Sequence, residues 1–404
     1  LQLIDMLLDR HGTGRVLLRN IRSSVSGFPA RLGQGVALTR PKDYAPNEPF
    51  PEVDLDNWPD KDPRVLWLVD LLTDRVADKF LLICAHQQTA MELEAWISSR
   101  TPIRSTVFHE GMDLVARDRA AAWFAESYRG AQLLVCSEIG SEGRNFQFAS
   151  NLILFDLPTS PDLLEQRIGR LDRIGQAHDV NIYVPYFQGS ASERLFRFYD
   201  EGLSVLTAPN PVAQSIADDF IEPLMTTDDI DGLMTTIIAE NKQRRDNLSE
   251  GRDRLLELSS HRPAVSTEIV EGIANHGGGN RLEAYMELSF DAFGLESDPL
   301  EDNIQIIRPT ESMIRNATVG LETQDRYRYP ELPEDGIRIT YDREMALSRE
   351  DVHFMTWENP ITVQAMDLLL SDTTGNACMV AVKHPSLPAG TLLVEVLSVD
   401  HVVA

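Results

Sequence analysis

The sequence predicts an α/β fold for the first half of the chain: a parallel-sheet lobe, followed by a helical spacer and an α+β domain. Two observations predict this order. Between residues 64 and 206, short apolar runs rich in β-branched residues alternate with amphipathic helices, and beyond residue 206 the alternation stops. Such alternation is typical of a parallel sheet covered by helices on both faces. The chain of 404 residues, 43% of them hydrophobic, is long enough for two or three domains.

The lobe at 64–206 is expected to contain five strands and the helices that connect them. Its apolar runs are short and bounded by turn residues, whereas the segments between them repeat apolar residues at helical spacing. The expected strands are 80–85, 105–109, 133–137, 151–157 and 180–186. The expected helices are 64–76, 89–99, 113–126, 165–176 and 192–206. A lobe of about 150 residues has a usual domain size.

The segments on either side of the lobe are predicted to be a linker and a spacer. Residues 1–63 are expected to form an inter-lobe segment and linker, with a helix and then a loop up to residue 40, and six prolines in residues 41–63. Residues 207–284 are expected to form the helical spacer. It contains a long polar helix at 228–259 and a glycine-rich hinge at 276–280.

Residues 285–404 are predicted to form the α+β domain, built on antiparallel strands. The expected strands are 303–309, 336–342, 377–384 and 391–399, with a helix at 361–370. His353, Trp357 and Glu358 fit core and turn positions better than a catalytic set. The sequence of this domain therefore indicates no chemistry.

The net charge of −26 is spread unevenly along the chain. Residues 1–205 carry 22 basic and 28 acidic residues, and residues 206–404 carry 15 and 35. The second half is therefore a poor candidate for binding DNA by charge alone. Its acidity fits solubility, docking on a basic protein surface or an acid-rich proteome, and composition does not choose among these.

Composition also limits the compartment and the metal chemistry. No apolar run reaches the roughly 18 residues of a membrane span and no signal peptide opens the sequence, so a cytoplasmic protein without a membrane partner is expected. Cys84, Cys136 and Cys378 lie singly in apolar runs. Buried free thiols are expected there, and no metal site.

The stretch EQRIGRLDRIGQ at 165–176 places two glycines and three arginines in what is expected to be one short helix. An interior glycine costs roughly 1 kcal/mol relative to alanine, so its presence indicates a need for close backbone approach. On one helix, Gln166, Arg170 and Arg173 would share a face. Two guanidinium forks on one face suit a polyphosphate, and a solvated basic face is the alternative.

A second candidate site follows the strand at 133–137. The loop from Ser137 to Asn145 leaves the carboxyl end of a strand, where open α/β sheets place ligands. Its glycines can present backbone N–H groups to a ligand. The alternative is an ordinary tight turn.

Four segments, in the correct order, resemble the second RecA-like lobe of superfamily-two helicases and translocases, most closely that of SWI/SNF-type ATPases. They are FLLICAHQQTAMELEAWI, FHEGMDLVARDRAAAWF, LLVCSEIGSEGRNFQFASNLILFDLP and QRIGRLDRIGQ. Later segments are similar to the bacterial RNA polymerase-associated members of this family. These are EGRDRLLELSS, ITYDREMALSREDVHFMTWENP and LPAGTLLVEVL.

The resemblance implies an ATP site between two lobes. It implies that Arg170 and Arg173 are arginine fingers, that Gln166 positions phosphate or a finger, and that Gly143 and Asn145 lie near the nucleotide. The sequence contains neither G-x-x-x-x-G-K-[ST] nor an Asp-Glu box. The phosphate cradle and the Mg²⁺ carboxylates are therefore expected on a first lobe outside this chain, and this chain alone is predicted to be inactive.

The resemblance also implies contacts to nucleic acid, from Gln87, His109, Gly111 and Ser137. The implied partners are the RNA polymerase core and double-stranded DNA or an RNA–DNA hybrid of the transcription complex, in the bacterial cytoplasm near the nucleoid. The expected function is an ATP-driven translocase that returns stalled or post-termination polymerase to initiation. A non-catalytic polymerase-docking module and a strand-separating helicase are the alternatives.

Overall fold

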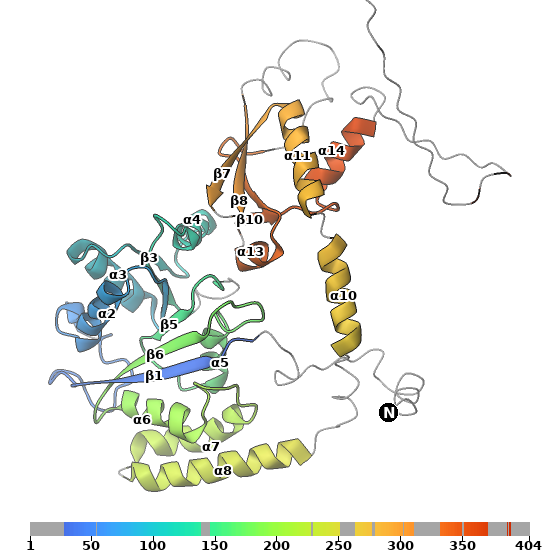
Figure 1. Cartoon of the computed structure of the whole chain (residues 1–404). Coiled ribbons are helices and arrows are strands. Elements are labelled where there is room, and N and C mark those ends of the chain that lie inside the picture. The colour runs from blue at the N-terminus through green and yellow to red at the C-terminus, as the bar shows by residue number, and fades with distance from the viewer. Residues whose placement is uncertain are drawn as a thin grey trace, which may run out of the picture.

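The computed structural model shows an α/β lobe and a smaller α+β unit (Figure 1). It describes residues 28–53, 55–138, 146–227, 229–250, 263–276, 279–301, 303–310, 332–349, 351–370, 386 and 388.

The lobe is built on a six-stranded sheet in the order β1-β6-β5-β2-β4-β3, with every neighbouring pair parallel. Its strands are β1 (Arg31–Leu38), β2 (Phe80–Cys84), β3 (Ser105–Phe108), β4 (Leu133–Ser137), β5 (Asn151–Leu154) and β6 (Val180–Phe187). The five strands predicted within 64–206 are confirmed. All residues of β2, β4 and β5 are buried, as strands covered on both faces should be.

Strand β1 corrects the prediction of a loop up to residue 40. It pairs with β6 over its full length of eight residues, so the sheet includes a segment that the sequence analysis assigned to the linker. Its glycines, Gly33 and Gly35, lower strand propensity and conceal the strand in the sequence. They are needed for packing: a Cβ on Gly33 would lie 2.7 Å from Cβ of Leu206, and one on Gly35 would meet the Phe196 ring.

Helices cover both faces of this sheet and bury two hydrophobic clusters. Helices α2 (Pro63–Asp74) and α3 (Gln87–Arg100) close one cluster, with Leu68 and Leu93 fully buried. Side chains alternate across the sheet, because Leu82 belongs to this cluster and Leu81 to the opposite one. The opposite face is covered by α4 (Leu114–Ala125), α5 (Pro161–Ile168) and α6 (Ala191–Arg197). Helices α7 (Ala213–Thr226) and α8 (Ile230–Glu250) extend the same hydrophobic cluster, with α8 packed on α7.

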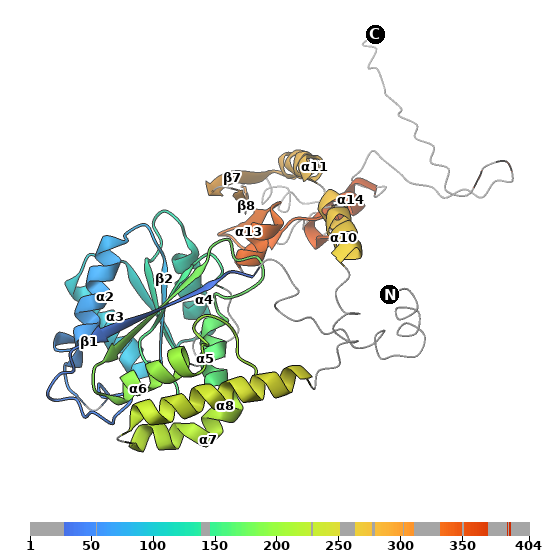
Figure 2. The same cartoon turned by 60° about the horizontal axis from the view of Figure 1, so that its bottom comes forward.

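The predicted long polar helix is present as α8, which lies beside α7 (Figures 1 and 2). It covers 230–250 of the predicted 228–259, and residues 251–262 lie outside the described residues. Helices α10 (Pro263–His276) and α11 (Gly279–Phe293) follow. The predicted hinge falls between them, and its residues 277 and 278 also lie outside the description.

The second sheet has four strands in the order β10-β9-β8-β7. Its elements are β7 (Leu295–Glu301), β8 (Ile304–Pro309), β9 (Ile337–Thr340), α13 (Arg343–Ser348), β10 (Val352–Phe354) and α14 (Pro360–Leu370). The pairs β7–β8 and β8–β9 are antiparallel, as predicted, but β9–β10 is parallel. The predicted antiparallel strands are therefore confirmed, and the sheet as a whole is mixed. The connection from β9 to β10 contains helix α13, which lets the chain return in the same direction.

The unit around this sheet has its own core. Trp357 packs against it and its ring lies 5.9 Å from that of Tyr285, in agreement with the predicted core role, whereas His353 and Glu358 are exposed. The strands predicted at 377–384 and 391–399 lie outside the described residues. In the part of the chain that the structure describes, no helix is both long and apolar enough to cross a membrane.

Candidate functional site

The candidate site lies at the carboxyl edge of the large sheet. Because neighbouring strands are parallel, the segments that follow β2, β3, β4 and β5 all leave the sheet at this edge. They carry Gln87, His109 to Gly111 and Asp156, and Ser137 is the last residue of β4 itself. The topology thus gathers residues that are far apart in the sequence.

Three of the four residues predicted to contact nucleic acid lie together. A Cβ on Gly111 would lie 2.7 Å from Nε2 of Gln87 and 3.1 Å from Nδ1 of His109. The backbone N–H of Gly111 donates to that same Nδ1 across 3.1 Å. Only glycine leaves room for this approach, so Gly111 has a steric role whether or not nucleic acid binds here.

Ser137, the fourth, is connected to the same loop through an acid that the sequence analysis did not single out. The buried Ser137 hydroxyl donates to Oε2 of Glu110 across 2.5 Å. Burial alone would raise the pKa of Glu110, but this hydrogen bond, its backbone hydrogen bond and the charges of His109 and Arg117 outweigh burial and lower it. The loop therefore carries a carboxylate among the four predicted contacts, and phosphate would be met by backbone N–H groups.

The arginine stretch is not one helix, which corrects the shared helical face predicted for Gln166, Arg170 and Arg173. Helix α5 ends at Ile168, and a turn follows in which the Arg170 N–H donates to the Arg167 carbonyl. Gly175 has a φ of +88°, a left-handed conformation that favours glycine. This conformation explains why the second glycine of the stretch is present at position 175.

The predicted phosphate ligands nevertheless lie close together around this turn. Gln166 is exposed in the last turn of α5, and Arg170 and Arg173 are half-buried. Nε of Arg173 donates to the Gly169 carbonyl across 2.9 Å. The other two predicted nucleotide contacts, Gly143 and Asn145, lie outside the described residues.

Arg170 lies close enough to β4 to affect a thiol there. Burial raises the pKa of Cys136, and the charge of Arg170 only partly opposes this. Burial likewise raises the pKa of Cys84. Both thiols are free and buried, as predicted, and the described residues contain no group of three or more ligands that could hold a metal ion.

Arg167 is a buried anchor of the arginine stretch that the sequence analysis missed. Its Nη1 lies 3.0 Å from Oδ1 of Asp156 and 2.7 Å from the Asp156 carbonyl oxygen, and its Nε lies 3.0 Å from the carboxylate of Glu138. Asp156 also accepts the Ala85 N–H across 2.8 Å. These contacts connect α5 to the ends of β2, β4 and β5.

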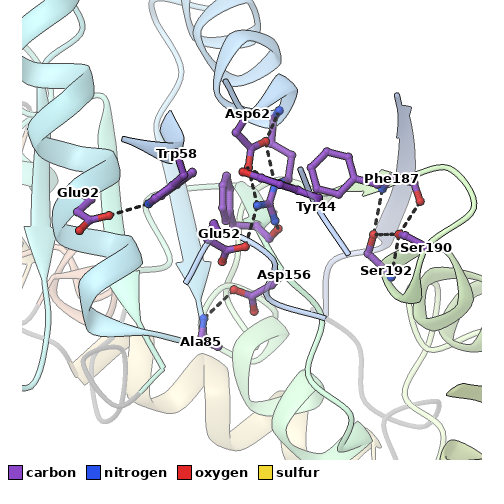
Figure 3. A network of polar contacts seen from close by, with 12 residues as sticks. Tyr44, Glu52, Trp58, Asp62, Ala85, Glu92, Asp156, Phe187, Ser190 and Ser192 are labelled. Atoms are coloured by element: carbon purple, nitrogen blue, oxygen red, sulfur yellow. Dashed lines mark hydrogen bonds and ion pairs between the residues drawn. The ribbon is translucent and has the colours of Figure 1, made fainter. Parts of the chain in front are cut away.

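A second buried arginine attaches the proline-rich segment to the same edge. Arg64 is ion-paired to Asp62 at 2.6 Å and to Glu52 at 2.9 Å, and the Tyr44 hydroxyl donates to Asp62 across 2.8 Å. Figure 3 shows that Tyr44, Asp62 and Glu52 belong to one network of polar contacts, and that Asp156 lies beside Glu52. Burial raises the pKa of Glu52, and the Asp156 charge adds to this effect while Arg64 opposes it.

Two family models match consecutive parts of the chain. Residues 64–175 match the helicase conserved C-terminal domain, and residues 179–404 match the C-terminal region of the RNA polymerase recycling family. The second match alone spans more than half of the chain. The chain belongs to the RNA polymerase recycling family. The predicted resemblances to a helicase lobe and to RNA polymerase-associated proteins are thereby confirmed.

Named members of the recycling family are similar over the whole chain. The RNA polymerase-associated protein RapA of Pseudomonas fluorescens (strain SBW25) is 45% identical over 425 residues, which cover 100% of this chain and 44% of that protein. RapA of Stutzerimonas stutzeri (strain A1501) is 44% identical with the same coverage. The chain thus spans less than half of the length of these relatives.

Solved structures resemble parts of the chain more distantly. The C-terminal part of the Fun30 ATPase domain is 19% identical, with a TM-score of 0.32, and the match covers 46% of this chain and 57% of that one. The Escherichia coli DEAD-box protein SrmB, in complex with the regulator RraA, is 22% identical, with a TM-score of 0.28, over 30% of this chain and 69% of that one. The family assignment does not depend on these likenesses.

Proposed function

We propose that this chain is the second motor lobe and the following domains of an ATP-dependent translocase on double-stranded nucleic acid. In the intact protein this motor would associate with the RNA polymerase core and promote its recycling during transcription. The observation that carries the proposal is the arginine stretch, which Arg167 anchors to the carboxyl edge of a helicase C-terminal lobe, in the same chain as a polymerase-recycling region.

The environments of the arginines support different roles within the stretch. Arg167 is neutralised by Asp156 and Glu138 and is nearly fully buried, so it serves structure. Arg173 forms no ion pair among the described residues and uses only Nε in a protein hydrogen bond. Its two Nη groups are therefore available to a phosphate, which fits an ATP site.

In this proposal ATP and Mg²⁺ bind between this lobe and a preceding one, and bound Mg²⁺ neutralises phosphate charge. Arg170 and Arg173 would stabilise the charge that develops on the transferred phosphoryl group. Such a contribution is worth roughly 10³ to 10⁵ in rate, or about 4 to 7 kcal/mol. Gln166 would hold a phosphate oxygen or one of the arginines, and Gly143 and Asn145 would contact the nucleotide.

The nucleic acid would be held at the neighbouring loops. Gln87 begins α3, and its side-chain Nε2 lies close to Gly111. The N–H groups of a first helical turn have no intrahelical partner, so those of α3 would be available to phosphate. Ser137 would act indirectly, because its hydroxyl holds the Glu110 side chain in place within this loop. Backbone N–H contacts recognise phosphates and not base sequence, as a translocase requires.

The acidity of residues 206–404 favours a second candidate, a docking module that grips a basic surface of RNA polymerase without ATP chemistry. Steady-state ATP hydrolysis by the intact protein separates the two candidates. Arg173→Lys should reduce kcat by about 100-fold or more with nucleotide binding retained. The control Arg245→Lys, at an exposed position on α8, should not. Unchanged turnover in Arg173→Lys would favour the docking module.

A further inference from the structure

Arg31, at the start of β1, contacts two acids of the arginine stretch, Glu165 and Asp172, with one guanidinium group. Its Nε donates to Oδ2 of Asp172 across 2.6 Å. Its Nη1 and Nη2 donate to the two carboxylate oxygens of Glu165, each across 2.9 Å, and Nη1 also donates to the Val205 carbonyl across 2.9 Å. These residues lie 134 to 174 positions away in the sequence.

The two acids are close in sequence to the side chains assigned to phosphate. Glu165 immediately precedes Gln166, and Asp172 lies between Arg170 and Arg173. Helix α5 ends at Ile168, and beyond it the backbone is held by turn hydrogen bonds, such as that from the Asp172 N–H to the Ile168 carbonyl, and by tertiary interactions. Arg31 contacts the part of the stretch beyond α5 through the side chain of Asp172.

Burial makes the contact rigid and specific. The side chains of Arg31 and Asp172 are 3% and 0% exposed, and that of Glu165 is 27% exposed. Burial alone would lower the pKa of Arg31, but the two carboxylates outweigh it and raise the pKa, so the guanidinium stays charged. A planar fork can contact both oxygens of one carboxylate while Nε reaches another, and a lysine ammonium cannot reproduce this geometry.

We propose that Arg31 is a positioning residue for the arginine fingers: it fixes the turn that presents Arg170 and Arg173 and touches no substrate itself. The inference rests on the proposed ATPase function. Arginine fingers act only when their geometry is held, and a misplacement of about 1 Å can cost 10²-fold in rate. Loss of the Arg31 contacts to Glu165 and Asp172 should therefore reduce kcat more than it changes KM.

The test uses the intact protein and measures kcat, KM for ATP and thermal unfolding for Arg31→Lys, Arg173→Lys and the double variant. Arg31→Lys should reduce kcat by about tenfold or more with KM changed less than about threefold. If Arg31 acts through the fingers, the double variant should lose less than about twofold beyond Arg173→Lys alone. If the loss of kcat in the double variant equals the product of the two single losses, the proposal is overturned.

Matched variants separate positioning from folding. Arg349→Lys removes an equally buried guanidinium, with a 2% exposed side chain paired to Asp351 near the second sheet, and should leave basal kcat within about twofold. If Arg31→Lys does not fold, Asp172→Asn is the second variant. It weakens the contact of Arg31 with Asp172 and should still lower kcat several-fold. A folded variant with normal kcat overturns the positioning role. Normal turnover in Arg173→Lys overturns the proposed function itself.

Discussion

Arg167 of helix α5 and Asp156, just beyond the end of strand β5, form a buried ion pair in which Nη1 lies 3.0 Å from Oδ1. Both side chains are 1% exposed. Burial alone would lower the pKa of Arg167, but Asp156 and Glu138 outweigh it, so the arginine remains charged. The pair fixes the helix that precedes the proposed arginine fingers to the centre of the sheet.

Asp156→Asn should destabilise the lobe, because it leaves a buried guanidinium with less compensating charge. The expected cost is about 3 kcal/mol, since breaking a buried pair by removing one partner is strongly destabilising. Thermal unfolding followed by circular dichroism should show the transition of this lobe lowered by about 6 to 10 °C. Asp70→Asn, at an exposed position on α2, serves as the control. Equal transitions for the two variants would contradict this account of the pair.

Gly111→Ala should weaken nucleic acid binding with little effect on folding. The added Cβ would lie 2.7 Å from Nε2 of Gln87, the far end of a flexible side chain that can move away. The loop at the carboxyl edge would then lose its present arrangement. Titration of duplex DNA against ATPase stimulation should show the half-saturating concentration raised about fivefold or more, with unstimulated turnover unchanged. An unchanged titration would remove Gln87, His109 and Gly111 from the proposed interface.

The second domain should lose stability in acid through Asp351. Burial alone would raise the pKa of Asp351, but Arg349 and Arg338 outweigh it and lower the pKa below the ordinary value of 3.8. Its stabilising contribution is therefore fully present above pH 3.8 and is lost as the pH falls through the lower, folded-state pKa.

Melting experiments on wild type and Asp351→Asn test that dependence. The variant should melt at a lower temperature at neutral pH, and the two proteins should converge at the acid end of the titration. If the difference in melting temperature between the two proteins stays constant from neutral pH to below the folded-state pKa, the carboxylate charge does not stabilise this domain.

The chain alone should not hydrolyse ATP, because its sequence contains neither the phosphate-binding lysine motif nor the Asp-Glu box of these motors. Phosphate release by purified residues 1–404 should stay at the background of a protein-free control, with and without duplex DNA. Turnover by the chain that depends on Arg173 would show that the missing groups are dispensable.

The sequence was sufficient for the parallel sheet because each of its central strands is an apolar run. It was insufficient for β1, because Gly33 and Gly35 are typical of a loop. Only the folded structure shows that they make room for Leu206 and Phe196. Around the arginine stretch, Leu164, Ile168 and Leu171 recur at spacings of four and three and are all buried, although the helix ends at Ile168.

The site was predicted unevenly for a related reason. Motif spacing indicates the residues that are proposed to meet a ligand, such as Arg170 and Arg173, because these are close in sequence. The residues that hold them are distant: Arg31 reaches Asp172 across 141 positions, and Glu138 reaches Arg167 across 29. No local pattern marks such pairs, because only the folded sheet brings them together.

Multi-round transcription by RNA polymerase, with the intact protein added, tests the central claim most directly. It compares wild type, Arg173→Lys and the exposed control Arg245→Lys at equal occupancy on polymerase. The account predicts that wild type and Arg245→Lys raise transcript yield in the presence of ATP, and that Arg173→Lys binds polymerase but raises it little or not at all. Full stimulation by Arg173→Lys would contradict an ATP-driven role for this lobe.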